Sequence, residues 1–120
     1  MDKRFVFAQR ERTLRYDISA MLALEEASGG KPTGAIVASL QQWSFTSLAL
    51  LLWAGFRHED KSLTQSQTRR ALEVFVNEPN ANVRQLRKDI TDAIESSAWY
   101  KQIDASTEDD EELPGDEPNP

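Results

Sequence analysis

The sequence predicts a small, mainly α-helical domain with an N-terminal β-hairpin, an α+β fold with four to five helices around a central apolar helix. Three features of the pattern lead to this prediction. Apolar residues alternate with polar ones before residue 17, they recur every three or four positions after it, and one stretch in the middle is apolar on every side. A length of 120 residues is typical of one domain with one modest core.

The hairpin is expected over residues 4–17. Phe5 and Phe7 alternate with polar neighbours, and Leu14 and Tyr16 do the same on the far side of the polar segment QRER. The turn is therefore expected in QRER, although this segment lacks the Gly or Asn typical of tight hairpin turns. Because a lone hairpin is only marginally stable in water, its aromatic face must pack against the helices.

Two helices are expected to follow the hairpin. Asp17 is a suitable N-cap for the first, which ends at Gly29 and Gly30, a pair typical of a helix C-terminus and a turn. The glycine pair is not a phosphate-binding loop, because the P-loop spacing is absent. The second is a short helix over residues 35–43. Its inward residues are expected to be Ile36, Val37 and Leu40.

The central helix is expected from about residue 45 to residue 56, with Ser44 or Ser47 as its N-cap. A helix that is apolar on all sides lies either inside a core or in a membrane. A membrane span needs about 20 residues, so this stretch is too short. We therefore expect it at the centre of the core, with Trp53 and Phe56 as core residues.

The last two helices are marked by their start signals and apolar spacing. Thr64 and Gln67 form a capping box for the first of them, which ends before Pro79, and the second begins near Asn80 or Asn82. The inward residues of the first are expected to be Ala71, Leu72, Val74 and Phe75. The inward stripe of the second is expected to be Val83, Leu86, Ile90, Ala93, Ile94, Ser97 and Ala98. Its outer face is expected to carry Arg84, Arg87, Lys88, Asp89, Asp92 and Glu95.

The charge is divided unevenly between a body and a tail. Residues 1–103 hold 14 basic and 12 acidic side chains, a net of +2, whereas residues 104–120 hold eight acidic side chains and no basic one. The tail also has three prolines and one large apolar residue, so it cannot bury enough surface to offset its ordering entropy. We expect one helical domain over 1–103 and a disordered acidic tail over 104–120. The simplest role for the tail is solvation, and docking or mimicry of a polyanion is the alternative.

The composition argues against catalysis and against several partners. There is no cysteine, and the only histidine, His58, lies in a charged linker where we expect it to be solvent-exposed. Glu25 and Glu26 are adjacent on a helix and do not face each other. We therefore expect no enzyme, cofactor or metal. A body of +2 with a tail of −8 also argues against nucleic acid binding, and the N-terminus lacks a signal peptide, which indicates a cytoplasmic protein with no membrane partner.

Three short motifs occur in order within residues 12–76. They are LRYDISAMLALEE, LLWAGFRH and the helix start LT. Their characteristic positions are Leu14, Arg15, Asp17, Ala20, Leu24, Glu25 and Glu26, then Leu51, Leu52, Trp53, Ala54, Gly55, Arg57 and His58, then Leu63 and Thr64. This order resembles the tail assembly chaperones of long-tailed bacteriophages and gene transfer agents.

The resemblance implies a non-catalytic chaperone. Proteins of this family bind the tape measure protein before the tail tube polymerises around it, and they are absent from the finished virion. For this chain it implies action in the host cytoplasm, with the tail tube protein as a second candidate partner and a homo-oligomer as a candidate state. Apolar residues not needed by the core are the expected client contacts. They are Trp43, Phe45, Trp99 and Tyr100, of which the last two could instead seal the core.

A different functional class also fits the composition. A small cytoplasmic adaptor or regulator would use the same helical body, and its acidic tail could mimic nucleic acid as an inhibitor. Changes in residues 104–120 separate the two functions, because a mimic needs the tail charge for activity and a chaperone needs it only for solubility.

Overall fold

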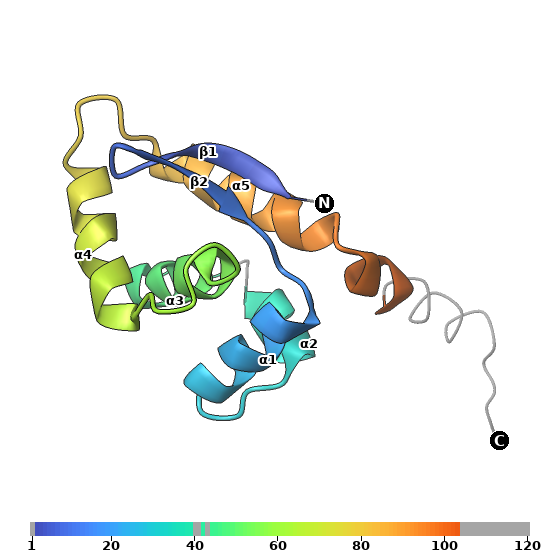
Figure 1. Cartoon of the computed structure of the whole chain (residues 1–120). Coiled ribbons are helices and arrows are strands. Elements are labelled where there is room, and N and C mark those ends of the chain that lie inside the picture. The colour runs from blue at the N-terminus through green and yellow to red at the C-terminus, as the bar shows by residue number, and fades with distance from the viewer. Residues whose placement is uncertain (1, 40–41, 43, 104–120) are drawn as a thin grey trace, which may run out of the picture.

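A computed structural model describes residues 2–39, 42 and 44–103 (Figure 1). The elements are β1 (Lys3–Phe7), β2 (Arg10–Leu14), α1 (Ile18–Ala27), α2 (Thr33–Ala38), α3 (Phe45–Phe56), α4 (Gln65–Val76) and α5 (Val83–Glu95). Residues 98–103 form a further short helical segment. The predicted fold class, mainly helical with an N-terminal antiparallel hairpin, is confirmed. The predicted tail, residues 104–120, lies outside the described residues, as do Leu40 and Trp43.

The hairpin turn lies two residues earlier than predicted. β1 and β2 pair with Phe7 opposite Arg10, so the turn consists of Ala8 and Gln9. Both turn residues have positive φ, 52° and 67°, as a two-residue turn of matching twist requires. The prediction of a turn in QRER was wrong, since its last three residues belong to β2. Alanine and glutamine rarely adopt this conformation, so neither residue marks the turn in the sequence.

Helix α3 is the centre of the molecule, as predicted. It packs against α1, α4, α5 and β2. Figure 1 shows α5 running alongside the hairpin, and α1 and α2 on the far side of α3 from α4. The aromatic face of the hairpin closes the core, with the Phe7 ring centroid 5.4 Å from that of Phe56 and 5.1 Å from that of Phe75.

Most predicted helix starts are confirmed by their N-caps. The caps whose side chain accepts a hydrogen bond from the backbone N–H three residues on are Asp17, Ser44, Thr64 and Asn82. The capping box of α4 is complete, because the Gln67 side chain also accepts from the Thr64 backbone N–H at 2.9 Å. α2 differs from the prediction, because it begins at Thr33, whose N–H donates to the Glu25 carboxylate at 2.8 Å.

Three expectations about side-chain orientation were wrong. Ala98 was expected on the inward stripe of the last helix but is exposed, because α5 ends at Glu95 and Ala98 begins a separate helical segment. Val74 was placed in the core but is 48% exposed, because α4 buries only a narrow side formed by Thr68, Leu72 and Phe75. Asp89 was placed on the outer face of α5 but is 5% exposed. Its carboxylate is satisfied by two partners, the Gln85 amide at 2.9 Å and the Lys3 ammonium at 3.7 Å. Hydrophobic periodicity does not reveal a buried carboxylate whose cationic partner lies on the hairpin.

The apolar character of the central stretch raises the possibility of a membrane span. Among the described residues, no helix combines the length and the apolar character needed to cross a membrane. α3 has 12 residues and most of its side chains face the core.

Candidate functional site

The C-terminal end of α3 is closed by the chain that leaves the hairpin. The Tyr16 hydroxyl donates to the Leu51 carbonyl at 2.6 Å, and the Arg15 backbone N–H donates to the Gly55 carbonyl at 3.0 Å. A Cβ atom on Gly55 would lie 2.6 Å from a Leu14 methyl carbon and 2.8 Å from the Tyr16 ring. Burial raises the pKa of the Tyr16 phenol far above its ordinary value, so the hydroxyl keeps its proton. The packing around Gly55 therefore leaves no room for a ligand between α3 and the chain that leaves the hairpin.

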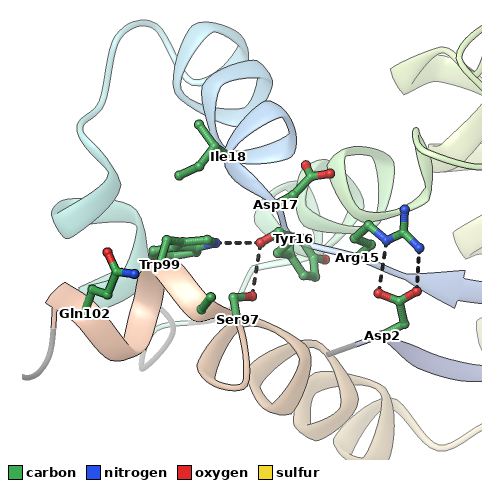
Figure 2. A pocket seen from close by; sticks show the side chains of 9 residues that line it. Asp2, Arg15, Tyr16, Asp17, Ile18, Ser97, Trp99 and Gln102 are labelled. Atoms are coloured by element: carbon green, nitrogen blue, oxygen red, sulfur yellow. Dashed lines mark hydrogen bonds and ion pairs between the residues drawn. The ribbon is translucent and has the colours of Figure 1, made fainter.

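Beside Tyr16 an open cleft of about 440 Å³ lies between the chain leaving the hairpin and the helical segment 98–103 (Figure 2). The Tyr16 backbone carbonyl accepts from the Ser97 hydroxyl at 3.0 Å and from the Trp99 indole N–H at 2.6 Å. The Arg15 guanidinium donates twice to the Asp2 carboxylate, at 3.0 and 2.8 Å. This contact lowers the pKa of Asp2 and raises that of Arg15. These polar groups are paired with one another, and the cleft places no nucleophile beside a base.

His58 has a structural contact and is not solvent-exposed as we expected. It is half-buried, and its Nε2 lies 2.8 Å from the Thr13 carbonyl oxygen. A carbonyl can only accept, so Nε2 is the donor. The neighbouring Glu59 carboxylate accepts from the Thr13 N–H at 3.1 Å. The two side chains therefore pair both outward backbone groups of Thr13, on the edge of β2 that does not face β1.

Residues 2–39, 42 and 44–103 contain no group of three or more His, Cys, Asp or Glu side chains placed to hold a metal ion.

The N-terminal end of α3 is open and apolar. A groove of about 340 Å³ runs between α3 and α4, and we call it the α3–α4 groove. Its lining residues are Phe45, Thr46, Ala49, Arg69, Leu72, Glu73 and Val76. Ala49 and Leu72 form a buried floor, whereas Phe45 at the start of α3 is 65% exposed. Arg69 and Glu73 stand one helical turn apart on α4 and give the apolar groove a charged rim.

The four predicted contact residues do not lie at one site. Phe45 lines the α3–α4 groove, and Trp43 lies outside the described residues. Trp99 and Tyr100 are half-buried against the core, with their ring centroids 5.9 Å apart, and Trp99 lines the cleft beside Tyr16. The groove residues of α4 were missed by the sequence reasoning. Periodicity identifies the apolar side of α4, but it does not reveal that α3 leaves part of that side uncovered.

Comparisons with known proteins identify no relative. No family model, curated protein or solved structure matches the chain. The functional interpretation therefore depends on the two clefts described above. The cleft beside Tyr16 is bordered by polar groups that pair with each other, whereas the α3–α4 groove has an apolar floor and an exposed aromatic ring. The second combination is typical of a groove that binds an amphipathic helix.

Proposed function

We propose that this protein is a non-catalytic phage tail assembly chaperone that holds an apolar helix of the tape measure protein in its α3–α4 groove. The observation that carries the proposal is Phe45, whose ring is 65% exposed beside the buried floor formed by Ala49 and Leu72. Covering a phenylalanine side chain contributes about 1.5–3 kcal/mol. A partner that covers Phe45 gains only part of this contribution, because the residue is 65% exposed before binding.

The chemistry of the groove specifies the kind of client segment. An elongated helical protein with exposed apolar stripes aggregates unless the stripes are covered. An amphipathic helix can place its apolar stripe on the groove floor and its flanking charges beside Arg69 and Glu73. The two rim charges have opposite sign, so they favour a client helix with both acidic and basic residues beside the stripe.

The motifs behind the resemblance support the proposal in an indirect way. Leu52 and Gly55 lie in the closed end of α3, and the Trp53 indole N–H donates to the Leu63 carbonyl at 3.0 Å. The Arg57 guanidinium lies 4.9 Å from the Trp53 ring centroid. These residues hold α3 and the start of α4 together, and so they maintain the walls of the groove.

The remaining parts of the proposal follow from the resemblance. Trp43, Trp99 and Tyr100 are secondary candidates for client contact, and the tail tube protein is a second candidate partner. The chaperone would act in the host cytoplasm, several copies would cover a long client, and none would remain in the virion. Each copy would then be released as the tail tube polymerises.

The test is co-expression with the tape measure protein of the same genome, followed by purification through a tag on the chaperone. Wild-type protein is expected to keep the client soluble and to co-purify with it. Phe45→Gln should reduce the co-purified client at least tenfold, because it removes the exposed ring from the groove. The matched control is Leu22→Gln, which changes an α1 side chain that is 58% exposed and does not line the groove. Equal loss of client in both variants would remove the groove from the proposal.

A second candidate function is an adaptor or inhibitor that acts through its acidic tail. It is favoured by the eight acidic and no basic side chains of residues 104–120. Replacing the tail carboxylates by amides in the full chain separates the two. A chaperone that uses the groove keeps its client and loses solubility, whereas a nucleic-acid mimic loses its activity.

A further inference from the structure

A third cleft, of about 500 Å³, lies between the start of α1 and the end of α3, and it carries an excess of positive charge. Its lining residues are Arg15, Asp17, Ser19, Ala20, Ala54, Arg57, His58 and Lys61. Three of these side chains are cations and one is a carboxylate, so the lining has a net charge of +2 with His58 neutral. We call it the basic cleft. The cleft beside Tyr16 and the α3–α4 groove have no such excess, since their charged lining residues sum to −1 and 0.

The charges inside the basic cleft are unequally satisfied. The Asp17 carboxylate accepts from the Ala20 N–H at 2.9 Å as the cap of α1, and Arg15 is paired with Asp2. Arg57 and Lys61 form no ion pair with another described residue; Arg57 only stacks on Trp53. Two cations are thus available for carboxylates that come from outside the described part of the chain.

The chain itself supplies an acidic segment a few residues beyond the last described residue. Gln102 lines the cleft beside Tyr16, and that cleft shares Arg15 and Asp17 with the basic cleft. The described residues end at Ile103, which follows Gln102 directly. The run EDDEE, Glu108–Glu112, lies five to nine residues further on. An extended chain of five to nine residues reaches at most about 17–32 Å.

We propose that the EDDEE segment of the chain's own tail docks in the basic cleft and pairs with Arg57 and Lys61. Each exposed ion pair is weak by itself, but a short tether holds the acidic segment at an effective concentration in the millimolar range. Docking shields the cleft from other anions. It is released by salt, because exposed charges are screened over about 3 Å at 1 M ionic strength. The inference does not depend on the client, since the basic cleft and the α3–α4 groove share no lining residue.

The experiment compares amide resonances of the full-length protein with those of a full-length variant in which Glu108–Glu112 carry amide side chains. At low salt, the resonances of Arg57, His58 and Lys61 are expected to differ between the two proteins, and those around Phe45 are expected to coincide. Raising the salt to about 1 M should bring the two spectra together. Coincident cleft resonances at low salt, or differences spread over all exposed basic residues, would overturn the proposal.

Variants in residues 1–103 test which cations bind the acidic segment. Chemical coupling tests whether that segment belongs to the same molecule. R57Q/K61Q should abolish the effect of tail neutralisation on the cleft resonances. The matched control K31Q/R84Q removes the same charge from exposed residues outside the cleft and should leave the effect in place. Zero-length carbodiimide coupling should join Lys61 to Glu108–Glu112 within one molecule. Coupling only between two molecules, seen as dimers whose yield rises with concentration, would reject the chain's own tail as the occupant.

Discussion

The two ends of α3 differ in how far their side chains are buried, although the helix is apolar at both ends. At the C-terminal end, Phe56 is 1% exposed, and Gly55 is enclosed by Leu14 and Tyr16. At the N-terminal end, Phe45 is 65% exposed beside the α3–α4 groove. Both ends carry a phenylalanine, and only one of them is used by the core.

This difference shows which end of α3 leaves an apolar surface exposed for a partner. The hairpin and the chain that leaves it pack on Phe56 and Gly55 at the closed end, whereas among the described residues Phe45 at the start of α3 stays mostly exposed. An apolar helix longer than its cover must expose one end, and the exposed end is available to a partner. The closed end should therefore respond to substitution with a loss of stability, and the open end with a loss of binding.

The largest effect is expected from Gly55→Ala. The added methyl group would lie 2.6 Å from a Leu14 side-chain carbon, and the neighbouring Tyr16 cannot move without losing its hydrogen bond to Leu51. We expect a loss of about 1–3 kcal/mol in the free energy of unfolding, measured by urea denaturation. Gly34→Ala in α2 is the control, because a Cβ there meets no atom within 4 Å. Equal effects of the two substitutions would show that the closed end is looser than its distances indicate.

Tyr16→Phe tests the closed end through pH. The raised pKa of Tyr16 means that the unfolded chain ionises this phenol from about pH 10, while the folded chain keeps it neutral. The contribution is therefore fully present below pH 10, and stability falls by about 1.4 kcal/mol per pH unit above it. The variant should lose about 1 kcal/mol at neutral pH, from the hydrogen bond to Leu51, and should show a flatter decline between pH 10 and 11. Parallel alkaline curves for the two proteins would contradict this.

Trp99→Phe should have a smaller effect on stability. It removes the indole N–H that donates to the Tyr16 carbonyl, but the Ser97 hydroxyl still donates to the same oxygen. We expect a loss of about 0.5 kcal/mol in the free energy of unfolding. Client binding should be unchanged if Trp99 seals the core. A tenfold loss of client with intact stability would instead place Trp99 in the contact surface.

Phe45→Gln should have the smallest effect on stability and the largest on binding. Because the ring is 65% exposed, the free energy of unfolding should change by no more than about 0.5 kcal/mol. Thermal unfolding of the free protein provides the measurement. A loss above 1 kcal/mol would mean that Phe45 belongs to the core, and the contrast between the two ends of α3 would disappear.

The sequence predicted the architecture better than it predicted the surfaces. The caps of α1 and α4 and the central position of α3 follow from local chemistry, which the sequence displays directly. The turn at Ala8 and Gln9 and the burial of Asp89 depend on tertiary contacts, and the sequence showed neither.

The candidate site was predicted in part. Phe45 was identified as an apolar residue not needed by the core, and its exposure agrees with that reading. Leu72 was predicted as a core residue and Val76 was not singled out, because a groove between two helices depends on how they pack and not on the pattern of either helix. Trp99, predicted either as a client contact or as a residue that seals the core, lines a different cleft.

The decisive measurement is a nuclear magnetic resonance titration of the labelled protein with a peptide from an amphipathic helix of the tape measure protein. We predict that the amide resonances of residues 45–49 and 69–76 shift in a saturable manner, while those of Tyr16 and Gly55 stay in place. Phe45→Gln should weaken binding of the peptide at least tenfold. The resonances of Tyr16 and Gly55 in this variant should match those of the wild-type protein. Shifts confined to the closed end, or to the cleft beside Tyr16, would contradict the assignment of the α3–α4 groove as the client site.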